Sequence, residues 1–192
     1  MADPQKIKKL EDPKTLRALA HPLRLRLLGL LRSRGPATVS TLATMVDQAV
    51  PLVSYHLRQL AEHGFIEAAP ELAKDRRETW WRSSHEFTSW SMTDFLDTPE
   101  RLDALGMLQQ EILRAHVARI QAFFDEAPTW DKDWLDASEM SDLRLSLTPG
   151  ELKQVIAELW EVIDRWRERA PSPDAGVAEL ILYGIPRQPG PR

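Results

Sequence analysis

Apolar side chains recur at intervals of three and four residues along much of the sequence, a spacing typical of helices with one buried face. Prolines at 13, 22, 51 and 99 stand where helices begin, since proline is tolerated in a first turn, and Gly64 stands where one ends. Asp12 is the expected N-cap of the first helix, and Thr38 or Ser40 that of the third. We expect helices at 13–20, 22–34, 38–46, 51–64, 99–126 and 149–169.

Short apolar and aromatic runs predict strands in four further places. The segments 65–69 and 78–83 are joined by the polar sequence PELAKDRR, which indicates a β-hairpin. The segments 143–147 and 177–185 flank the helix at 149–169, which the capping-box sequence TPGE introduces. Such a strand–helix–strand unit is long enough to form two parallel strands.

The helices at 38–46 and 51–64 are separated by a tight connection, which is the pattern of a helix-turn-helix. A β-hairpin follows them directly, so the order of elements predicts a winged helix. In that arrangement the second helix enters the DNA major groove, and the hairpin lies along the backbone or minor groove.

The helix at 51–64 has two different faces. Val53, Leu57 and Leu60 lie within one narrow sector and predict the packed face. The opposite face is polar, with one acid at its far end, so base reading is favoured over an ordinary solvated face. His56 lies beside the packed face, and we expect it to be partly buried and hydrogen-bonded rather than to read bases. The DNA-contacting residues expected here are Thr38, Gln48, Pro51, Ser54, Tyr55, Arg58 and Gln59.

Three cations in the hairpin loop, Lys74, Arg76 and Arg77, are expected to contact phosphates. The alternative is an ordinary charged turn. Charge elsewhere is uneven: residues 1–92 carry 14 Lys and Arg against 10 Asp and Glu, whereas residues 93–192 carry 11 against 19. A basic first half favours a polyanionic partner, although chance gives splits of this size too.

Composition excludes several classes. The chain has 192 residues and no cysteine, which excludes a disulfide scaffold, thiolate metal sites and a cysteine nucleophile. No apolar run is long enough to span a membrane, and the polar N-terminus does not look like a secretory signal. Glycine-rich phosphate loops, nucleophile elbows and HExxH are missing from the sequence, so we expect no enzyme.

The sequence contains 18 arginines against 7 lysines, which hints at a GC-rich bacterial genome. We expect a bacterial, cytoplasmic protein that joins the nucleoid when bound to DNA.

Three stretches of the sequence, 16–31, 38–67 and 76–82, resemble the ArsR-like winged-helix transcriptional regulators. The pattern SxHLxxLxxxGxI, from Ser54 to Ile66, carries most of this resemblance, and AHPLRLRLL is a second match. The resemblance implies a homodimer, usually a repressor, that binds a palindromic operator, with terminal helices in the dimer interface.

The sequence departs from the metal-sensing members of that family. Their thiolate sites need cysteine, and their other common site uses paired His and acidic residues on the dimer helix. The helix at 99–126 has only His116, which we expect in the core, and His85-Glu86 is an adjacent pair rather than a helical one. We therefore expect no metal and no cofactor.

The second half of the chain is longer than the minimal family needs. The helix at 99–126 carries an apolar stripe that predicts dimerisation, although packing within the chain is an alternative. The stripe residues expected to dimerise are Leu105, Leu108, Ile112 and Phe123. Tryptophans in this half could line a site for an apolar organic effector, or belong to an ordinary core. They are Trp130, Trp134, Trp160 and Trp166, with Trp90 just before this half.

These patterns predict a mainly α fold with small β elements. We expect a winged helix-turn-helix domain at 1–92, a dimerisation and candidate effector-binding region at 93–186, and a disordered tail at 187–192. The long dimerisation helix is followed by the strand–helix–strand extension. The predicted function is a sequence-specific regulator that binds double-stranded DNA as a homodimer, acting as a repressor on a palindromic operator. The alternative is a winged-helix protein-interaction module without DNA binding.

Overall fold

The computed structural model describes residues 6–73, 75 and 78–187. By their contacts these residues form two compact units, 6–124 and 125–187. The first unit contains α1 (Pro13–Leu19), α2 (Pro22–Ser33), α3 (Val39–Val46), α4 (Val50–Glu62) and α5 (Pro99–Glu126), the last of which ends just inside the second unit. The second unit contains α6 (Lys132–Ala137) and α7 (Pro149–Arg167). All six predicted helices are therefore confirmed.

The helix starts follow the local signals in the sequence. The Thr15 backbone N–H donates to Asp12 Oδ1 at 2.9 Å, and the Leu23 N–H donates to His21 Nδ1 at 3.1 Å. The Thr41 N–H donates to Thr38 Oγ1 at 3.2 Å, so Thr38, rather than Ser40, caps α3. Each side chain satisfies an N–H that has no partner within its own helix.

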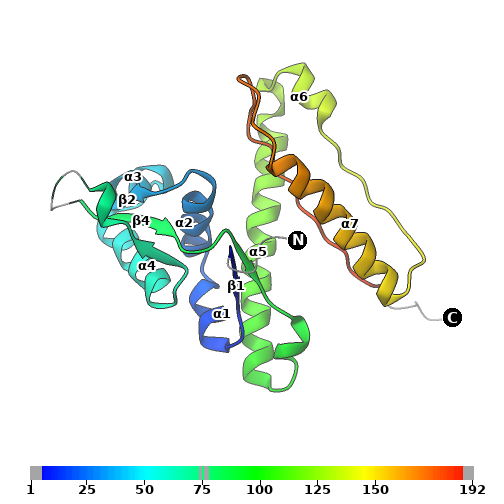
Figure 1. Ribbon diagram of the computed structural model, residues 1–192, viewed down its shortest axis with the longest axis horizontal. Coiled ribbons are helices and arrows are strands. Elements are labelled where there is room, and N and C mark those ends of the chain that lie inside the picture. Colours follow the sequence, from blue (N-terminus) through cyan, green and yellow to red (C-terminus); the bar gives the residue numbers. More distant parts are fainter. Residues whose placement is uncertain (1–5, 74, 76–77, 188–192) are drawn as a thin grey trace. The chain divides into compact units, whose positions relative to one another are not determined.

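The wing is a small antiparallel sheet. Its strands are β2 (Ala37–Thr38), β4 (Trp80–Ser83) and β3 (Ile66–Ala68), in the order β2-β4-β3. Ala37 is opposite Trp81, and Ile66 is opposite Ser83. Figure 1 shows this sheet beside α3 and α4. The predicted hairpin is confirmed, and β2 is a third strand that the sequence did not reveal.

A second sheet pairs distant parts of the chain. The strand β1 (Ile7–Lys9) runs parallel to β5 (Phe87–Ser89), with Ile7 opposite Phe87. Arg32 fixes β5 to α2, because its Nε donates to the His85 carbonyl at 3.1 Å and its Nη2 donates to Thr88 Oγ1 at 2.7 Å. Burial lowers the pKa of the Arg32 guanidinium to about 10, so it stays charged at neutral pH.

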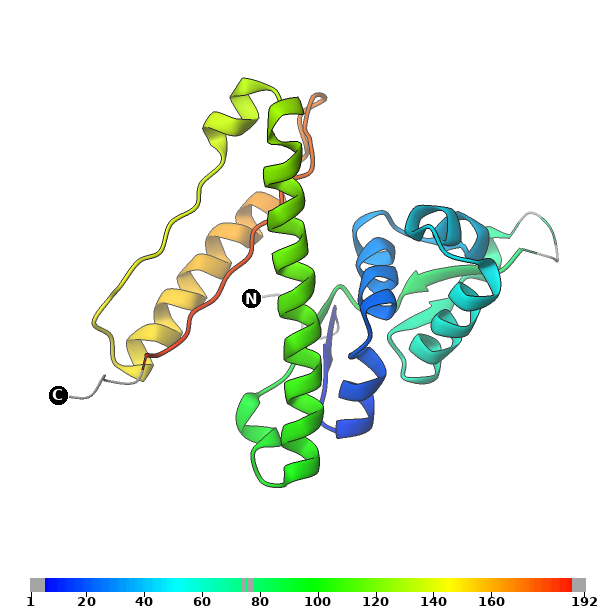
Figure 2. The same cartoon turned by 180° about the vertical axis from the view of Figure 1, so that it is seen from behind.

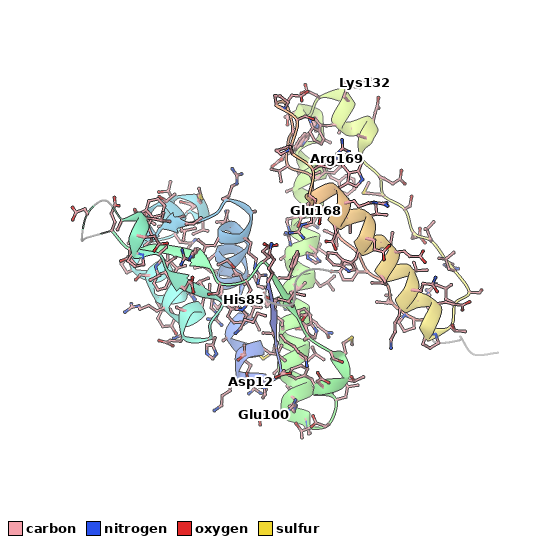
Figure 3. All side chains as sticks on the ribbon, in the orientation of Figure 1. Asp12, His85, Glu100, Lys132, Glu168 and Arg169 are labelled. Atoms are coloured by element: carbon pink, nitrogen blue, oxygen red, sulfur yellow. The ribbon has the colours of Figure 1, made fainter. Side chains whose placement is uncertain are left out.

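The first half of α5 is part of the winged-helix core. Ala104, Leu105 and Leu108 are buried in the same apolar cluster as residues from α1 to α4. The start of α5 is also tied to α1 by an ion pair between Arg17 Nη1 and Glu100 Oε1 at 3.0 Å (Glu100 is labelled in Figure 3). The contacts therefore divide the chain after Phe124, whereas the domain boundary expected from the sequence lies after residue 92.

The second unit is built around α7. Thr148 and Glu151 form the predicted capping box: the Glu151 N–H donates to Thr148 Oγ1 at 3.3 Å, and the Thr148 N–H donates to Glu151 Oε2 at 2.7 Å. At the other end, the guanidinium of Arg169 lies 4.2 Å from the centre of the Trp166 ring (Arg169 is labelled in Figure 3). None of the described residues 125–187 is buried.

The predicted strands of this unit are wrong. Residues 143–147 and 177–185 have no regular secondary structure. Figures 1 and 2 show the two segments as extended chain on opposite sides of α7. A strand is defined by the ladder it forms with a neighbour, and here α7 separates the two candidates for that ladder. Within one chain, the extension is thus a helix with an extended, non-strand segment on each side of it. Residue 187 has no regular structure, and the rest of the predicted tail lies outside the described residues.

Candidate nucleic-acid interface

The turn between α3 and α4 is short and internally hydrogen-bonded. Asp47 has the left-handed backbone conformation, with φ of 54°, and the Gln48 N–H donates to the Ala43 carbonyl at 3.1 Å. The Arg26 guanidinium, from α2, donates to the Met45 carbonyl at 3.0 Å and the Val46 carbonyl at 3.3 Å. These bonds satisfy carbonyls at the end of α3 and hold the angle between the two helices.

The N-terminus of α4 is open to an anion. Its N-cap, Ala49, has no side chain that can accept a hydrogen bond, and its first turn contains no acidic residue. Within α4, no side chain therefore neutralises the first N–H groups or the positive end of the helix dipole. Ser40, Thr44, Gln48 and the acidic Asp47 line an open hollow beside this end.

The outer face of α4 carries the predicted reading residues. Tyr55 is 51% exposed, and Pro51 and Arg58 are also exposed. Arg58 Nε donates to the Ser54 carbonyl at 3.3 Å, which uses one of the five N–H donors of its guanidinium. Exposed Leu52, which sequence reasoning did not select, adds an apolar side chain to this face.

Three predicted residues are already engaged or only partly accessible. The Gln59 amide donates one of its two N–H groups to Glu62 Oε2 at 2.7 Å, which restricts how the side chain can turn toward a base. Ser54 is half-buried. The Thr38 hydroxyl caps α3 and lies 2.8 Å from Thr41 Oγ1. Of the predicted set, Tyr55 and Arg58 have the clearest access from the middle of α4.

The inner face of α4 contains an unusual polar group. His56 is buried more fully than expected, and its ring lies against that of His21, with centroids 4.3 Å apart and ring planes tilted by 39°. Its Nδ1 has no hydrogen-bond partner among the described residues, so the expected bond is not found at that atom. Burial, together with His21 and Arg24, lowers the pKa of His56, and burial and Arg24 lower that of His21. Both shifts favour the neutral form of the ring.

The described part of the wing is not cationic. Arg82 Nε pairs with Glu67 Oε1 at 2.7 Å, and its Nη1 pairs with Glu71. Trp80 Nε1 donates to Glu78 Oε2 at 3.2 Å. The described cation of the wing, Arg82, is thus already paired with acids. The predicted loop cations Lys74, Arg76 and Arg77 lie outside the described residues.

The predicted dimerisation stripe is only partly available. Leu105 and Leu108 are buried in their own chain, Ile112 packs against the same core, and Phe123 is half-buried. The expectation of one exposed stripe is therefore wrong for Leu105 and Leu108, because the winged helix covers them. A different apolar row is exposed, and we call it the distal seam: Leu113, Val117, Ile120 and Phe124. Its spacing of four, three and four residues is that of a coiled coil and was visible in the sequence.

The remaining predictions concern ligands and membranes. Within residues 6–73, 75 and 78–187, no three His, Asp or Glu side chains lie close enough to hold a metal ion. His116 and His85 are half-buried. No helix of the described chain is both long and apolar enough to cross a bilayer. Trp130 and Trp134 contact each other, with ring centroids 6.3 Å apart, and Trp160 and Trp166 are exposed.

Comparison with known proteins identifies one part of this arrangement. Residues 19–68, from the end of α1 through β3, match the family model described as a helix-turn-helix domain. With the wing that follows, this region is a winged helix-turn-helix, as the sequence predicts. No curated protein matches the chain closely enough to count as a relative.

Similar solved structures include the homodimeric winged helix-turn-helix DNA-binding domain of a possible ArsR-family transcriptional regulator from Mycobacterium bovis. It shares 21% identity and covers 58% of this chain and 81% of that one, with a TM-score of 0.34. An ArsR family transcriptional regulator shares 29% identity over 59% of this chain and 94% of its own, with a TM-score of 0.31. A possible transcriptional regulator for arsenical resistance shares 28% identity over 68% and 99%, with a TM-score of 0.32.

Proposed function

We propose that this protein is a sequence-specific transcriptional regulator that binds double-stranded DNA through α4. The observation that carries the proposal is the outer face of α4. It presents Tyr55 and Arg58 to solvent next to a helix N-terminus whose first turn holds no acid and whose N-cap has no capping side chain. Arginine reads guanine with two parallel hydrogen bonds, and an open helix N-terminus binds a phosphate, so one helix supplies both base reading and positioning.

The proposed active form is a homodimer. The distal seam on α5 leaves four apolar side chains in contact with water at coiled-coil spacing. A second copy of α5 covers such a row with the same row, as two-fold symmetry requires. Two copies of α4 then bind half-sites of a palindromic operator, about one helical turn or a multiple of it apart. Binding over a promoter gives repression.

Three further parts of the proposal follow from the same chemistry. The protein is not an enzyme and needs no metal or other cofactor, since its function rests on binding alone. It works in the bacterial cytoplasm, on the nucleoid. An apolar organic effector, if the regulator uses one, binds near the tryptophans of the second unit. Isothermal titration with candidate apolar compounds tests that last point, and binding that persists in Trp134→Ala argues against this location.

The experiment compares Arg58→Ala with Arg114→Ala, a control that removes one positive charge from α5. Duplexes selected from a random pool by the purified protein supply the operator. Arg58→Ala is expected to cost about 1–3 kcal/mol on the operator, roughly 5- to 150-fold in affinity, and little on a scrambled duplex. Arg114→Ala should leave both affinities within about twofold. Arg77→Ala should weaken both duplexes equally and lower the salt slope by about one.

Two results contradict the proposal. If Arg58→Ala weakens operator and scrambled DNA equally, Arg58 contacts phosphate and the reading residues lie elsewhere. If the selection enriches no sequence and no duplex binds at low salt, α4 is not a DNA surface. The second candidate function, a protein-interaction module, then gains support, and exposed Leu52 on the same face favours it specifically.

A further inference from the structure

The second unit has an apolar surface that its own chain does not cover. The two segments beside α7, residues 138–147 and 177–185, are extended but belong to no sheet. Leu143 is 81% exposed, and Val177 is 88% exposed. Their large exposed apolar residues are Met140, Leu143, Leu145, Leu147, Val177, Leu180, Leu182, Tyr183 and Ile185.

The backbone of the first segment is as open as its side chains. Residues 143–147 alternate apolar and polar, as a strand does, yet no backbone–backbone hydrogen bond of the described chain starts or ends within them. The second segment packs on α7. A Cβ added to Gly184 would lie 2.7 Å from Ile156 Cδ1 and 3.5 Å from Leu152 Cδ1, so this part of the segment packs directly on α7. Unpaired strand edges of this kind recruit another chain.

The two segments cannot pair with each other within one chain as it is folded here. Figures 1 and 2 show α7 between them in both views. Their charges are complementary: Arg144 is the only charged residue of 143–147, and Glu179 is the only charged residue of 177–185. Pairing of one segment with the other therefore brings opposite charges together, whereas pairing of either segment with itself repeats a like charge.

We propose that a second copy of this chain completes the second unit, with residues 143–147 of one protomer forming a β-ladder with residues 177–185 of the other. This inference rests on the homodimer of the proposed function and adds an interface to it. Two-fold symmetry forms both ladders at once, since each protomer offers one segment of each kind. The nine large apolar residues of the two segments are 39% to 88% exposed, so the pairing removes apolar surface from water.

Cysteine cross-linking tests the pairing directly, because the natural sequence contains no cysteine. Two single-cysteine proteins, Arg144→Cys and Glu179→Cys, are co-refolded, oxidised and separated under non-reducing conditions. A mixed covalent dimer is expected to form at least tenfold more than with the control Lys153→Cys, whose site lies on α7. Ser146→Cys and Ile181→Cys extend the scan by two residues in each segment, so that a shift in register is detected.

The alternatives give different products. In the double variant Arg144→Cys/Glu179→Cys, a disulfide within one chain shows that the two segments pair inside the protomer and overturns the inference. A dimer by sedimentation in which none of the cysteine pairs cross-links also overturns it. If the protein is a monomer at micromolar concentration and no cross-links form, the exposed segments bind a different protein, and the inference is again wrong.

A substitution arm separates this interface from the distal seam. Leu145→Asp should raise the dissociation constant of the dimer at least tenfold, and Ser141→Asp, outside the paired segment, should leave it unchanged. Unfolding measured by circular dichroism identifies a variant that merely fails to fold. DNA binding is scored independently. If cross-links form but no DNA binds, this interface is supported and the proposed function is wrong. If a dimer binds DNA but no cross-links form, the proposed function is supported and this interface is wrong.

Discussion

The most informative perturbation compares two leucines on α5 that lie five residues apart. Leu108 has no exposed surface and belongs to the winged-helix core, whereas Leu113 is 53% exposed on the distal seam. Leu108→Ala removes buried methyl groups and leaves a cavity among core side chains, so it should lower the free energy of unfolding by about 2–5 kcal/mol. Leu113→Ala removes a group already half in contact with water and should cost the folded protomer at most about 1 kcal/mol.

The assay is urea unfolding followed by tryptophan fluorescence at several protein concentrations. Stability that comes from dimerisation depends on concentration, and stability from the core of one protomer does not. Leu108→Ala should therefore lower the unfolding midpoint by the same amount at every concentration. Leu113→Ala should have its main effect at high concentration, where wild-type protein is dimeric.

One result would refute this reasoning. If Leu108→Ala destabilised the protein only at high concentration, Leu108 would contribute to the dimer rather than to the winged helix. The assignment of the first half of α5 to the core would then be wrong. A concentration-independent loss of several kcal/mol for Leu113→Ala would refute the distal seam in the same way.

Two further predictions concern the winged helix itself. The pKa values of His21 and His56 are lowered below 6.5 in the folded state, so the unfolded chain binds more protons in acid. The stabilisation should therefore be complete above about pH 6.5 and fall as the pH drops below it. His21→Asn keeps a capping acceptor and should flatten this pH dependence, which urea titrations at pH 5 and 7 measure. Gly64 has φ of +67°, so Gly64→Ala should lower the free energy of unfolding by about 1–2 kcal/mol. Gly29 lies inside α2 with open space around it, so Gly29→Ala should raise the free energy of unfolding by about 0.5–1 kcal/mol. Equal thermal midpoints for the two variants would contradict this prediction.

The sequence by itself determined the helices and the order of elements in the winged helix. The helix starts depend on groups within four residues of each other, such as the Asp12 and Thr38 caps and the capping box of Thr148 and Glu151. Such signals act locally, so they are legible without knowledge of the fold. The packed face of α4 was equally legible, because helical spacing alone places Val53, Leu57 and Leu60 on one side.

Only the tertiary structure decided which of these elements meet. Nothing near residue 7 indicates a partner at residue 87, and the apolar pattern of α5 does not say that Leu108 faces the winged helix while Leu113 faces water. The sequence likewise does not show that Arg82 pairs with Glu67 and Glu71. The segments at 143–147 and 177–185 have the composition of strands, but a strand forms only where another backbone is in reach. Contacts between distant residues depend on how the whole chain packs, and periodicity in one segment does not contain that information.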